Sequence, residues 1–395
     1  MKAIFQAALM SWRVRRLRSI MNDFLVTLLI LSLYSCGKES VRSESELDIP
    51  GYHYKLGERR LEEGDFKGAL SAFGRSIKLD PKFAIGWGGL GYSQANLGEI
   101  ENGKKSVDKA VTLDSKDARI WVWRGRYGTV AKRDKDWLEK VEKNFYRSLE
   151  ILPGNEKAEY YLGVAYLQSY NFKAAESQFS RVVEKRGRLA KKANENWELC
   201  QKIVRASPGT LAGKKIAIQP EITRADLAVL FAEELKLSEI FQQRTPLSAS
   251  MEFKSPKEMM KESVKSSIPA DIEDFWAKPW IVEVIELGVF EVDPSGNFNP
   301  KKKITRVDYA MAIQRIIARI SNDESLESRY FGETTSRFTD VPTTHFAYNA
   351  IALCKERGMM KADMLTGKFN PTAMVAGADA LLIIREIQGS LRMTF

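Results

Sequence analysis

Small and apolar residues recur at a fixed interval of 34 positions in the first half of the chain. The repeated pairs are Leu56 and Leu90, Gly57 and Gly91, and Gly64 and Gly98. A period of this length predicts pairs of short helices that stack side by side, so that each pair covers the apolar face of the next. Small side chains at Gly57 and Gly91 let the two helices of a pair approach closely, while Phe73 and Trp87 fill the space between pairs. The pattern therefore predicts an all-α solenoid.

Two further copies of the pattern follow with less regular spacing. The third contains Trp121, Gly125, Phe145, Ser148 and Pro153, with four extra residues around positions 133–137, and the fourth contains Leu162, Gly163, Tyr166, Ala175 and Phe179. Over residues 50–187 the four copies resemble the tetratricopeptide repeat, a 34-residue helix–turn–helix family. Residues 188–207 have an amphipathic pattern and are expected to form the additional helix that closes such an array.

The resemblance implies an inner face, formed mainly by the first helix of each repeat, to which a protein partner binds. In the phase of the pattern this face is lined by Tyr92, Asn96, Arg119, Val122, Arg126, Tyr160, Val164 and Gln168. Tyrosine and arginine are residue types that often carry binding energy at interfaces. The alternative that each of these side chains only packs on its neighbour stays open.

A different pattern begins after residue 209. Residues 222–226 read Ile-Thr-Arg-Ala-Asp and residues 304–308 read Ile-Thr-Arg-Val-Asp, each followed by an apolar helical face. Thr223 and Thr305 stand three residues before Asp226 and Asp308, which is the spacing of a helix capping box. The two motifs therefore predict the starts of two equivalent helices.

Two loops in the same region repeat at an offset of 71 residues. The matching positions are Gly296 and Gly367, Phe298 and Phe369, and Pro300 and Pro371. Together with the Thr-Arg-x-Asp motifs they resemble the S-layer homology module over residues 216–388, which would hold about two and a half modules. The first copy has no recognisable leading half, and residues 236–270 are expected to form a long exposed insertion.

The resemblance implies that these modules bind a cell-wall polymer or peptidoglycan. The residues concerned are Thr223, Arg224 and Asp226 in one motif and Thr305, Arg306 and Asp308 in the other. Capping needs no arginine, whereas a guanidinium at the positive end of a helix can hold a carboxylate or phosphate by paired hydrogen bonds. In the third copy Gly377 stands in place of the arginine, so at most two such sites remain. A purely structural role of the modules is the alternative.

The start of the chain has the pattern of a bacterial export signal. Arginines at positions 13, 15, 16 and 18 precede an apolar run over residues 24–33 that is too short for an ordinary transmembrane helix. The run ends in Leu33-Tyr-Ser-Cys36, which resembles the lipobox of bacterial lipoproteins. The resemblance implies removal of residues 1–35, a lipid on Cys36 that holds the protein on a membrane, and a polar tether over residues 36–49. A plain signal peptide, with a cysteine at position 36 by chance, is the alternative. Met21 is an alternative start, although only a start at Met1 supplies the basic residues.

Composition narrows the possible functions. The formal net charge is +10, and removal of residues 1–35 lowers it to about +6, but no stripe of basic and aromatic residues indicates nucleic-acid binding. With two histidines and no close pair of cysteines, we expect neither a metal site nor a cofactor. Cys200 and Cys354 lie in amphipathic patterns and are expected to be buried free thiols. Since no nucleophile or phosphate-binding motif occurs, we do not expect an enzyme.

Two hypotheses of function follow, besides a third, a hydrolase of wall polymers, which no catalytic constellation in the sequence supports. In the first, the chain is a non-catalytic envelope scaffold that binds an unidentified envelope protein through the repeats and wall polymer through the last modules. In the second, it resembles the pilotin-type lipoproteins that help to assemble a secretin or pilus, and the last modules are structural. In both it is lipid-anchored, and Gly37 after Cys36 favours the outer membrane, facing the periplasm, if the cell has two membranes.

Overall fold

The computed structural model describes residues 48–244 and 268–393, and the regular secondary structure in these two ranges is helical. The chain forms two compact units that divide between Ala131 and Lys132, inside the expected third repeat. The expected signal sequence, the lipid acceptor Cys36 and both candidate start positions lie outside the described residues.

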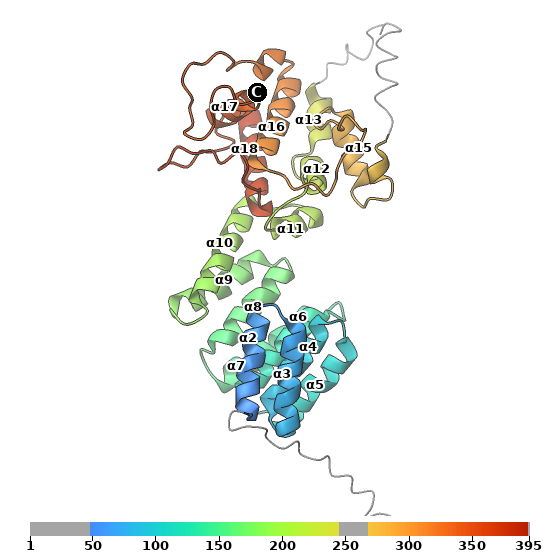
Figure 1. Ribbon diagram of the computed structural model, residues 1–395, viewed down its shortest axis with the longest axis vertical. Coiled ribbons are helices and arrows are strands. Elements are labelled where there is room, and N and C mark those ends of the chain that lie inside the picture. The colour runs from blue at the N-terminus through green and yellow to red at the C-terminus, as the bar shows by residue number, and fades with distance from the viewer. Residues whose placement is uncertain (1–47, 245–267, 394–395) are drawn as a thin grey trace, which may run out of the picture. The chain divides into compact units, whose positions relative to one another are not determined.

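The N-terminal unit, residues 48–131 of the described chain, is built from helical hairpins (Figure 1). Its helices are α2 (Pro50–Glu62), α3 (Phe66–Leu79), α4 (Ala84–Asn96), α5 (Ile100–Leu113) and α6 (Ala118–Ala131). Gly64 and Gly98 follow the first helix of each hairpin with φ values of 77° and 86°, a conformation that favours glycine. The side chain of Asp65 then accepts a hydrogen bond of 2.8 Å from the amide of Gly68 and caps α3. The hairpins predicted from the 34-residue period are confirmed.

Small residues allow the paired helices to touch. A Cβ on Gly91 would lie 2.7 Å from the carbonyl oxygen of Gly103 on the neighbouring helix, and a Cβ on Gly57 would lie 2.6 Å from the ring of Phe73. Phe73 is fully buried, and its ring packs against that of Trp123 at a centroid distance of 5.8 Å. These contacts confirm the predicted roles of the glycines and of Phe73.

The packed part of the chain begins before α2. Asp48 is buried and accepts hydrogen bonds from His53 at 2.7 Å and from Arg75. The hydroxyl of Ser76 donates to the carbonyl of Pro50 at 2.8 Å. Position 48, predicted to belong to the tether, is therefore part of the fold, because two basic side chains hold its carboxylate.

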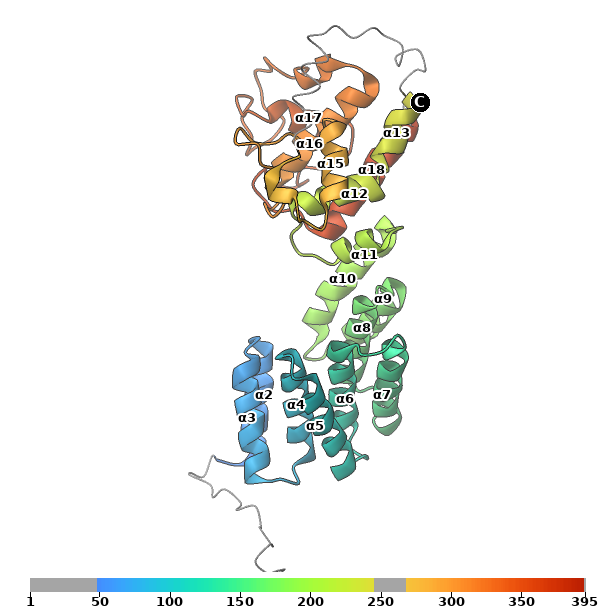
Figure 2. The ribbon, with the colours of Figure 1, turned by 90° about the vertical axis from the view of Figure 1, so that its right-hand side faces the viewer.

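The C-terminal unit, residues 132–393 with the gap at 245–267, starts with the rest of the repeat array. Its first helices are α7 (Trp137–Ile151), α8 (Glu156–Gln168), α9 (Phe172–Glu184) and α10 (Ala190–Ala206). Asn155 and Asn171 cap α8 and α9 with their side chains. The predicted closing helix is α10, which packs on α9 and on the last helix of the chain, α18 (Gly377–Met393) (Figure 2).

The remainder of this unit contains helix pairs joined by loops. Its helices are α11 (Leu211–Ala217), α12 (Arg224–Glu233), α13 (Leu237–Arg244), η2 (Ala270–Ile272), α15 (Lys278–Glu286), α16 (Arg306–Ser321), η3 (Glu324–Glu327), α17 (Tyr348–Glu356) and α18. Backbone hydrogen bonds join the segments that precede α12, α16 and α18 into a closed ring: the amide of Ile222 donates to Val375, that of Val375 to Ile304, and that of Ile304 to Ile222, at 2.9–3.0 Å. The ring holds the starts of these three helices side by side.

Two expectations about this region are wrong. The first copy does have a leading helix, α11, but only residues 218–223 separate it from α12, whereas residues 287–305 separate α15 from α16. Because the glycine-rich loop is missing, no repeated signal marked this copy. The proposed insertion at 236–270 is not exposed throughout, since α13 lies in it and Leu237 is fully buried in the hydrophobic core.

Both cysteines of the described chain are buried free thiols, as predicted. Burial raises the pKa of Cys200 to about 12, so this thiol is protonated at neutral pH. Among the described helices, none combines the length and the apolar character needed to span a bilayer.

Candidate functional site

Both predicted capping boxes are present. The hydroxyl of Thr223 donates to the carboxylate of Asp226 at 2.7 Å, and that of Thr305 donates to Asp308 at 2.6 Å. The same carboxylates accept the backbone amides of the two threonines, and the amides of the aspartates donate to the threonine hydroxyls. These four side chains are therefore held in place at the starts of α12 and α16.

Arg224, the arginine of the first motif, reaches into the loop between α15 and α16. Its guanidinium lies over the rings of Phe290 and Phe298, 4.7 and 4.6 Å from their centres, and donates to the carbonyl of Glu291. Burial lowers the pKa of Arg224 below its ordinary value, but an arginine stays charged at neutral pH. Its Nε is enclosed by protein and has no hydrogen-bond acceptor among the described residues.

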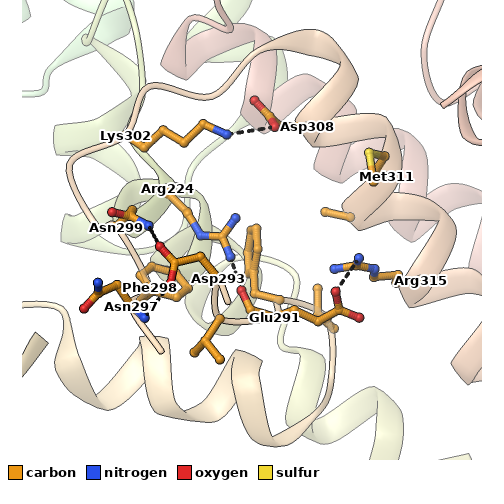
Figure 3. A pocket seen from close by; sticks show the side chains of 14 residues that line it. Arg224, Glu291, Asp293, Asn297, Phe298, Asn299, Lys302, Asp308, Met311 and Arg315 are labelled. Carbon is orange, nitrogen blue, oxygen red and sulfur yellow. Dashed lines mark hydrogen bonds and ion pairs between the residues drawn. The ribbon is translucent and has the colours of Figure 1, made fainter. Parts of the chain in front are cut away.

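A pocket of about 230 Å³ opens beside Arg224 (Figure 3). Its polar lining is Arg224, Glu291, Asp293, Asn297, Asn299, Lys302, Asp308 and Arg315. Figure 3 shows two ion pairs on either side of the Arg224 guanidinium: Lys302 with Asp308 at 3.4 Å and Arg315 with Glu291 at 3.0 Å. Most of the charge in this pocket is thus compensated within the protein.

Arg306, the arginine of the other motif, makes the corresponding contacts one module later. It donates from Nε to the carbonyl of Phe369 and from Nη2 to that of Lys361, both at 2.8 Å, and lies 4.5 Å from the centre of the Phe369 ring. A pocket of about 430 Å³ adjoins it, lined by Arg306, Lys361, Ala362, Asp363, Lys368, Phe369, Asn370, Thr372 and Ala373. Each arginine therefore packs on the loop of the following module.

The third position of this arrangement is closed. Gly377 begins α18 where the arginine would stand, and its amide donates to the carbonyl of Gln219 at 2.9 Å. A Cβ on Gly377 would lie 1.7 Å from the carbonyl oxygen of Ile216 at the end of α11. The glycine is explained by this contact, because the end of α11 leaves no space for a side chain at this position.

Sequence reasoning missed the residues that hold the pocket loops. Asp271 accepts the amides of Phe298 and Asn299 at 3.0 and 2.6 Å. Asp340 does the same for Phe369 and Asn370 at 2.8 and 2.7 Å. Each aspartate lies near the start of its module and holds the same part of the loop, but it stands 27 residues before the phenylalanine in one module and 29 in the other, so no constant spacing marked the pair. Lys368 lies inside the repeated loop motif, between Gly367 and Phe369, but its position there is not repeated, because Asn297 stands at the matching place. No motif contains Lys361 or Arg315.

The predicted inner-face residues are placed as follows. In the N-terminal unit, the Arg126 guanidinium lies over Tyr92 and Trp123, 4.0 and 4.3 Å from the ring centres, and Arg119 pairs with Asp117 at 2.5 Å. Asn96 donates to the carbonyl of Tyr92 at 2.9 Å. Val122 is buried among the helices, so its expected place on an open face is wrong.

In the C-terminal unit, Tyr160 is half-buried and its hydroxyl accepts a hydrogen bond of 3.2 Å from Asn196 of the closing helix. Val164 and Gln168, one and two turns further along α8, are half-buried as well. All three side chains thus keep accessible surface while they pack on their own unit.

Comparison with known families identifies one part of the chain. Residues 270–310 match the family model of the S-layer homology domain. This segment runs from η2 through the pocket loop to Arg306 and Asp308 at the start of α16. The predicted resemblance is confirmed there, and S-layer homology domains associate this part of the chain with the cell envelope.

Three solved structures are similar to the chain. One is the MamA protein, with 20% identity, a TM-score of 0.26, and 40% of this chain and 88% of that chain covered. Another is a tetratricopeptide repeat protein from Parabacteroides merdae ATCC 43184, with 15% identity, a TM-score of 0.27, and coverages of 72% and 94%. The third is Naa15/Naa10 bound to HypK-THB, with 14% identity, a TM-score of 0.28, and coverages of 79% and 37%. No curated protein matches the sequence.

Proposed function

We propose that this protein is a non-catalytic scaffold of the bacterial cell envelope. Its helical repeats bind an envelope protein, and its C-terminal modules bind a wall polymer or peptidoglycan. A lipid on Cys36 anchors it in a membrane, with the outer membrane as the proposed location. The S-layer homology match supports the envelope association, and the helical hairpins support a role in protein binding.

The observation that carries the proposal is the repeated placement of Arg224 and Arg306. Both stand at the start of a helix, stack on a phenylalanine of the next module, and line an open pocket. The positive end of the helix and the guanidinium both attract negative charge, so an acidic substituent of a glycan is a suitable ligand. Phenylalanine packing fixes the arginine before the ligand arrives, which reduces the entropy lost on binding.

A sedimentation assay with purified cell-wall sacculi tests this proposal. We expect Arg224→Ala with Arg306→Ala to weaken binding at least tenfold, because a charge-assisted hydrogen bond contributes about 1.5–3 kcal/mol. Arg329→Ala with Arg357→Ala removes the same charge outside both pockets and should bind like the unchanged protein. Melting temperature and helical signal are recorded for every variant, since both arginines also hold backbone carbonyls.

If the alanine variant does not fold, Arg224→Lys with Arg306→Lys provides the test. Lysine keeps the charge but lacks the planar fork, so we expect weaker sacculus binding from a folded protein. A folded variant of either kind that sediments like the unchanged protein contradicts wall binding.

A second candidate function is that of an assembly factor for a secretin or pilus, with structural C-terminal modules. One observation favours it: the guanidinium groups of Arg224 and Arg306 already donate to backbone carbonyls of Glu291, Phe369 and Lys361. In this case the two arginines act as clamps between modules, and removing them changes stability but not sacculus binding.

Binding of a protein partner is tested on the repeats. We expect Arg126→Ala with Tyr160→Ala to lose a partner in cross-linking from native envelopes, because arginine and tyrosine supply large, oriented contact area. The loss of the Arg126 contacts with Tyr92 and Trp123 should itself cost only about 1 kcal/mol of stability.

The matched control for this test is Arg124→Ala with Tyr146→Ala. Arg124 pairs with Asp108 of α5, and Tyr146 is exposed on α7, so neither belongs to the proposed binding face. Equal cross-linking by both double variants would show that neither Arg126 nor Tyr160 takes part in partner binding.

A further inference from the structure

The two arginine pockets differ in their charge, although the motifs that build them are almost identical. The Arg224 pocket is lined by three basic residues, Arg224, Lys302 and Arg315, and by three acidic ones, Glu291, Asp293 and Asp308. Lys302 and Arg315 are each paired with one of these carboxylates. An anion that enters this pocket would meet as many negative as positive side chains.

The Arg306 pocket has an excess of positive charge. Its basic residues are Arg306, Lys361 and Lys368, and Asp363 is the one acidic residue among those that line it. Both lysines are exposed and have no carboxylate at ion-pair distance within the described part of the chain. The Oδ1 atom of Asp363 accepts hydrogen bonds from the amides of Leu365 and Thr366 and from the hydroxyl of Thr366. This carboxylate therefore stabilises the loop conformation.

The other carboxylates near Arg306 are also engaged by the protein. Asp340 holds the amides of Phe369 and Asn370 at 2.8 and 2.7 Å. Asp379 pairs with Lys202 at 2.8 Å. Neither neutralises the two lysines, which leaves the pocket cationic.

A single equivalent position shows how the difference arises. The carbonyl that accepts the Nη2 hydrogen bond of the arginine belongs to Glu291 in one pocket and to Lys361 in the other. The backbone contact is the same, while the side chain at the pocket edge has the opposite charge. Such a change alters which ligand is attracted, while the hydrogen bond from the arginine to the backbone carbonyl is kept.

We propose that the Arg306 pocket, with Lys361 and Lys368, is the site that holds an anionic group, a phosphate or carboxylate, and that the Arg224 pocket does not. This deepens the proposed wall binding, on which it rests for the identity of the polymer. The guanidinium supplies directed hydrogen bonds and the lysines supply charge. The binding polymer then has its acidic substituent at one pocket and an uncharged part at the other.

Methionine methyl groups provide separate reporters for the two pockets. Met311 lines the Arg224 pocket, while Met360 and Met364 flank the Lys361–Asp363 edge of the Arg306 pocket. The full chain carrying Cys36→Ser, labelled at the methionine methyl groups, is titrated with inorganic phosphate and followed by NMR. We expect saturable shifts of the Met360 and Met364 signals at phosphate concentrations that leave Met311 unchanged.

Two charge-matched double variants complete the experiment. Lys361→Gln with Lys368→Gln should raise the phosphate concentration for half-saturation at least tenfold, whereas Lys302→Gln with Arg315→Gln should change it less than twofold. The proposal is overturned if Met311 responds at equal or lower phosphate, if no methionine responds, or if the first double variant binds phosphate normally. Phosphate binding without sacculus binding would instead reject the proposed wall function and keep the anion site.

Discussion

Replacing Gly377 by alanine is expected to destabilise the C-terminal unit by about 3 kcal/mol or more. The added Cβ would lie 1.7 Å from the carbonyl oxygen of Ile216 and 2.6 Å from its carbonyl carbon, so backbone rather than a flexible side chain has to move. The hydrogen bond from Gly377 to Gln219 fixes the same two segments together. Gly377→Arg, which restores the residue of the other two motifs, should be at least as damaging. Urea unfolding followed by circular dichroism measures the change.

Gly389 provides a control in the same helix. A Cβ there would have no atom within 4 Å, so Gly389→Ala should stabilise α18 by about 0.5–1 kcal/mol through helix propensity alone. If Gly377→Ala proves as harmless as Gly389→Ala, the third arginine position is not closed by α11. The loss of arginine there would then need another cause.

Local signals in the sequence were sufficient for the repeats and for the helix starts. The 34-residue period predicted the pairing of helices because each close contact depends on a glycine such as Gly57 or Gly91. At these positions the neighbouring helix leaves no space for a side chain. The Thr-x-x-Asp spacing likewise predicted the caps of α12 and α16, since a capping box lies within four consecutive residues. Such features are encoded over short stretches of chain and can be read without the fold.

The architecture of the last modules could not be predicted in the same way. α11 was missed because the glycine-rich loop that follows the leading helix in the other modules is missing here. The ring formed by Ile222, Ile304 and Val375 joins residues that are far apart in sequence, so it could not be predicted either. The pairing of each arginine with the loop of the next module depends on the same ring. The charge of a pocket also follows from this pairing. Lys361 could be assigned to a pocket only after the structure showed that Arg306 donates a hydrogen bond to its carbonyl.

The junction between the closing helix and the last modules depends on one buried carboxylate, and removing its partner should have a large effect. Glu234 is 4% exposed and accepts the amides of Gly209 and Thr210 at 3.1 and 2.9 Å. Arg385 donates to this carboxylate at 2.7 Å and to the carbonyls of Ala206 and Ser207 at 2.6 and 2.9 Å. Arg385→Ala leaves a buried charge without its cation and should cost about 3–5 kcal/mol in the free energy of unfolding. The exposed Arg205, on α10, is the control, and Arg205→Ala should change it by less than about 0.5 kcal/mol.

The pH dependence of stability separates this ion pair from simple packing. Burial alone would raise the pKa of Glu234, but the amides of Thr210 and Gly209, the Thr210 hydroxyl and Arg385 together hold it below its ordinary value of 4.5. A depressed carboxylate pKa contributes stability that is present above the ordinary value and is lost as the pH falls through the native one. Between about pH 5 and pH 3, Glu234→Gln should therefore lose less stability than the unchanged protein, although it is less stable at pH 7. Parallel pH profiles for the two proteins would mean that Glu234 titrates as it does in the unfolded chain, and that the junction is held by packing of α10 on α18 alone.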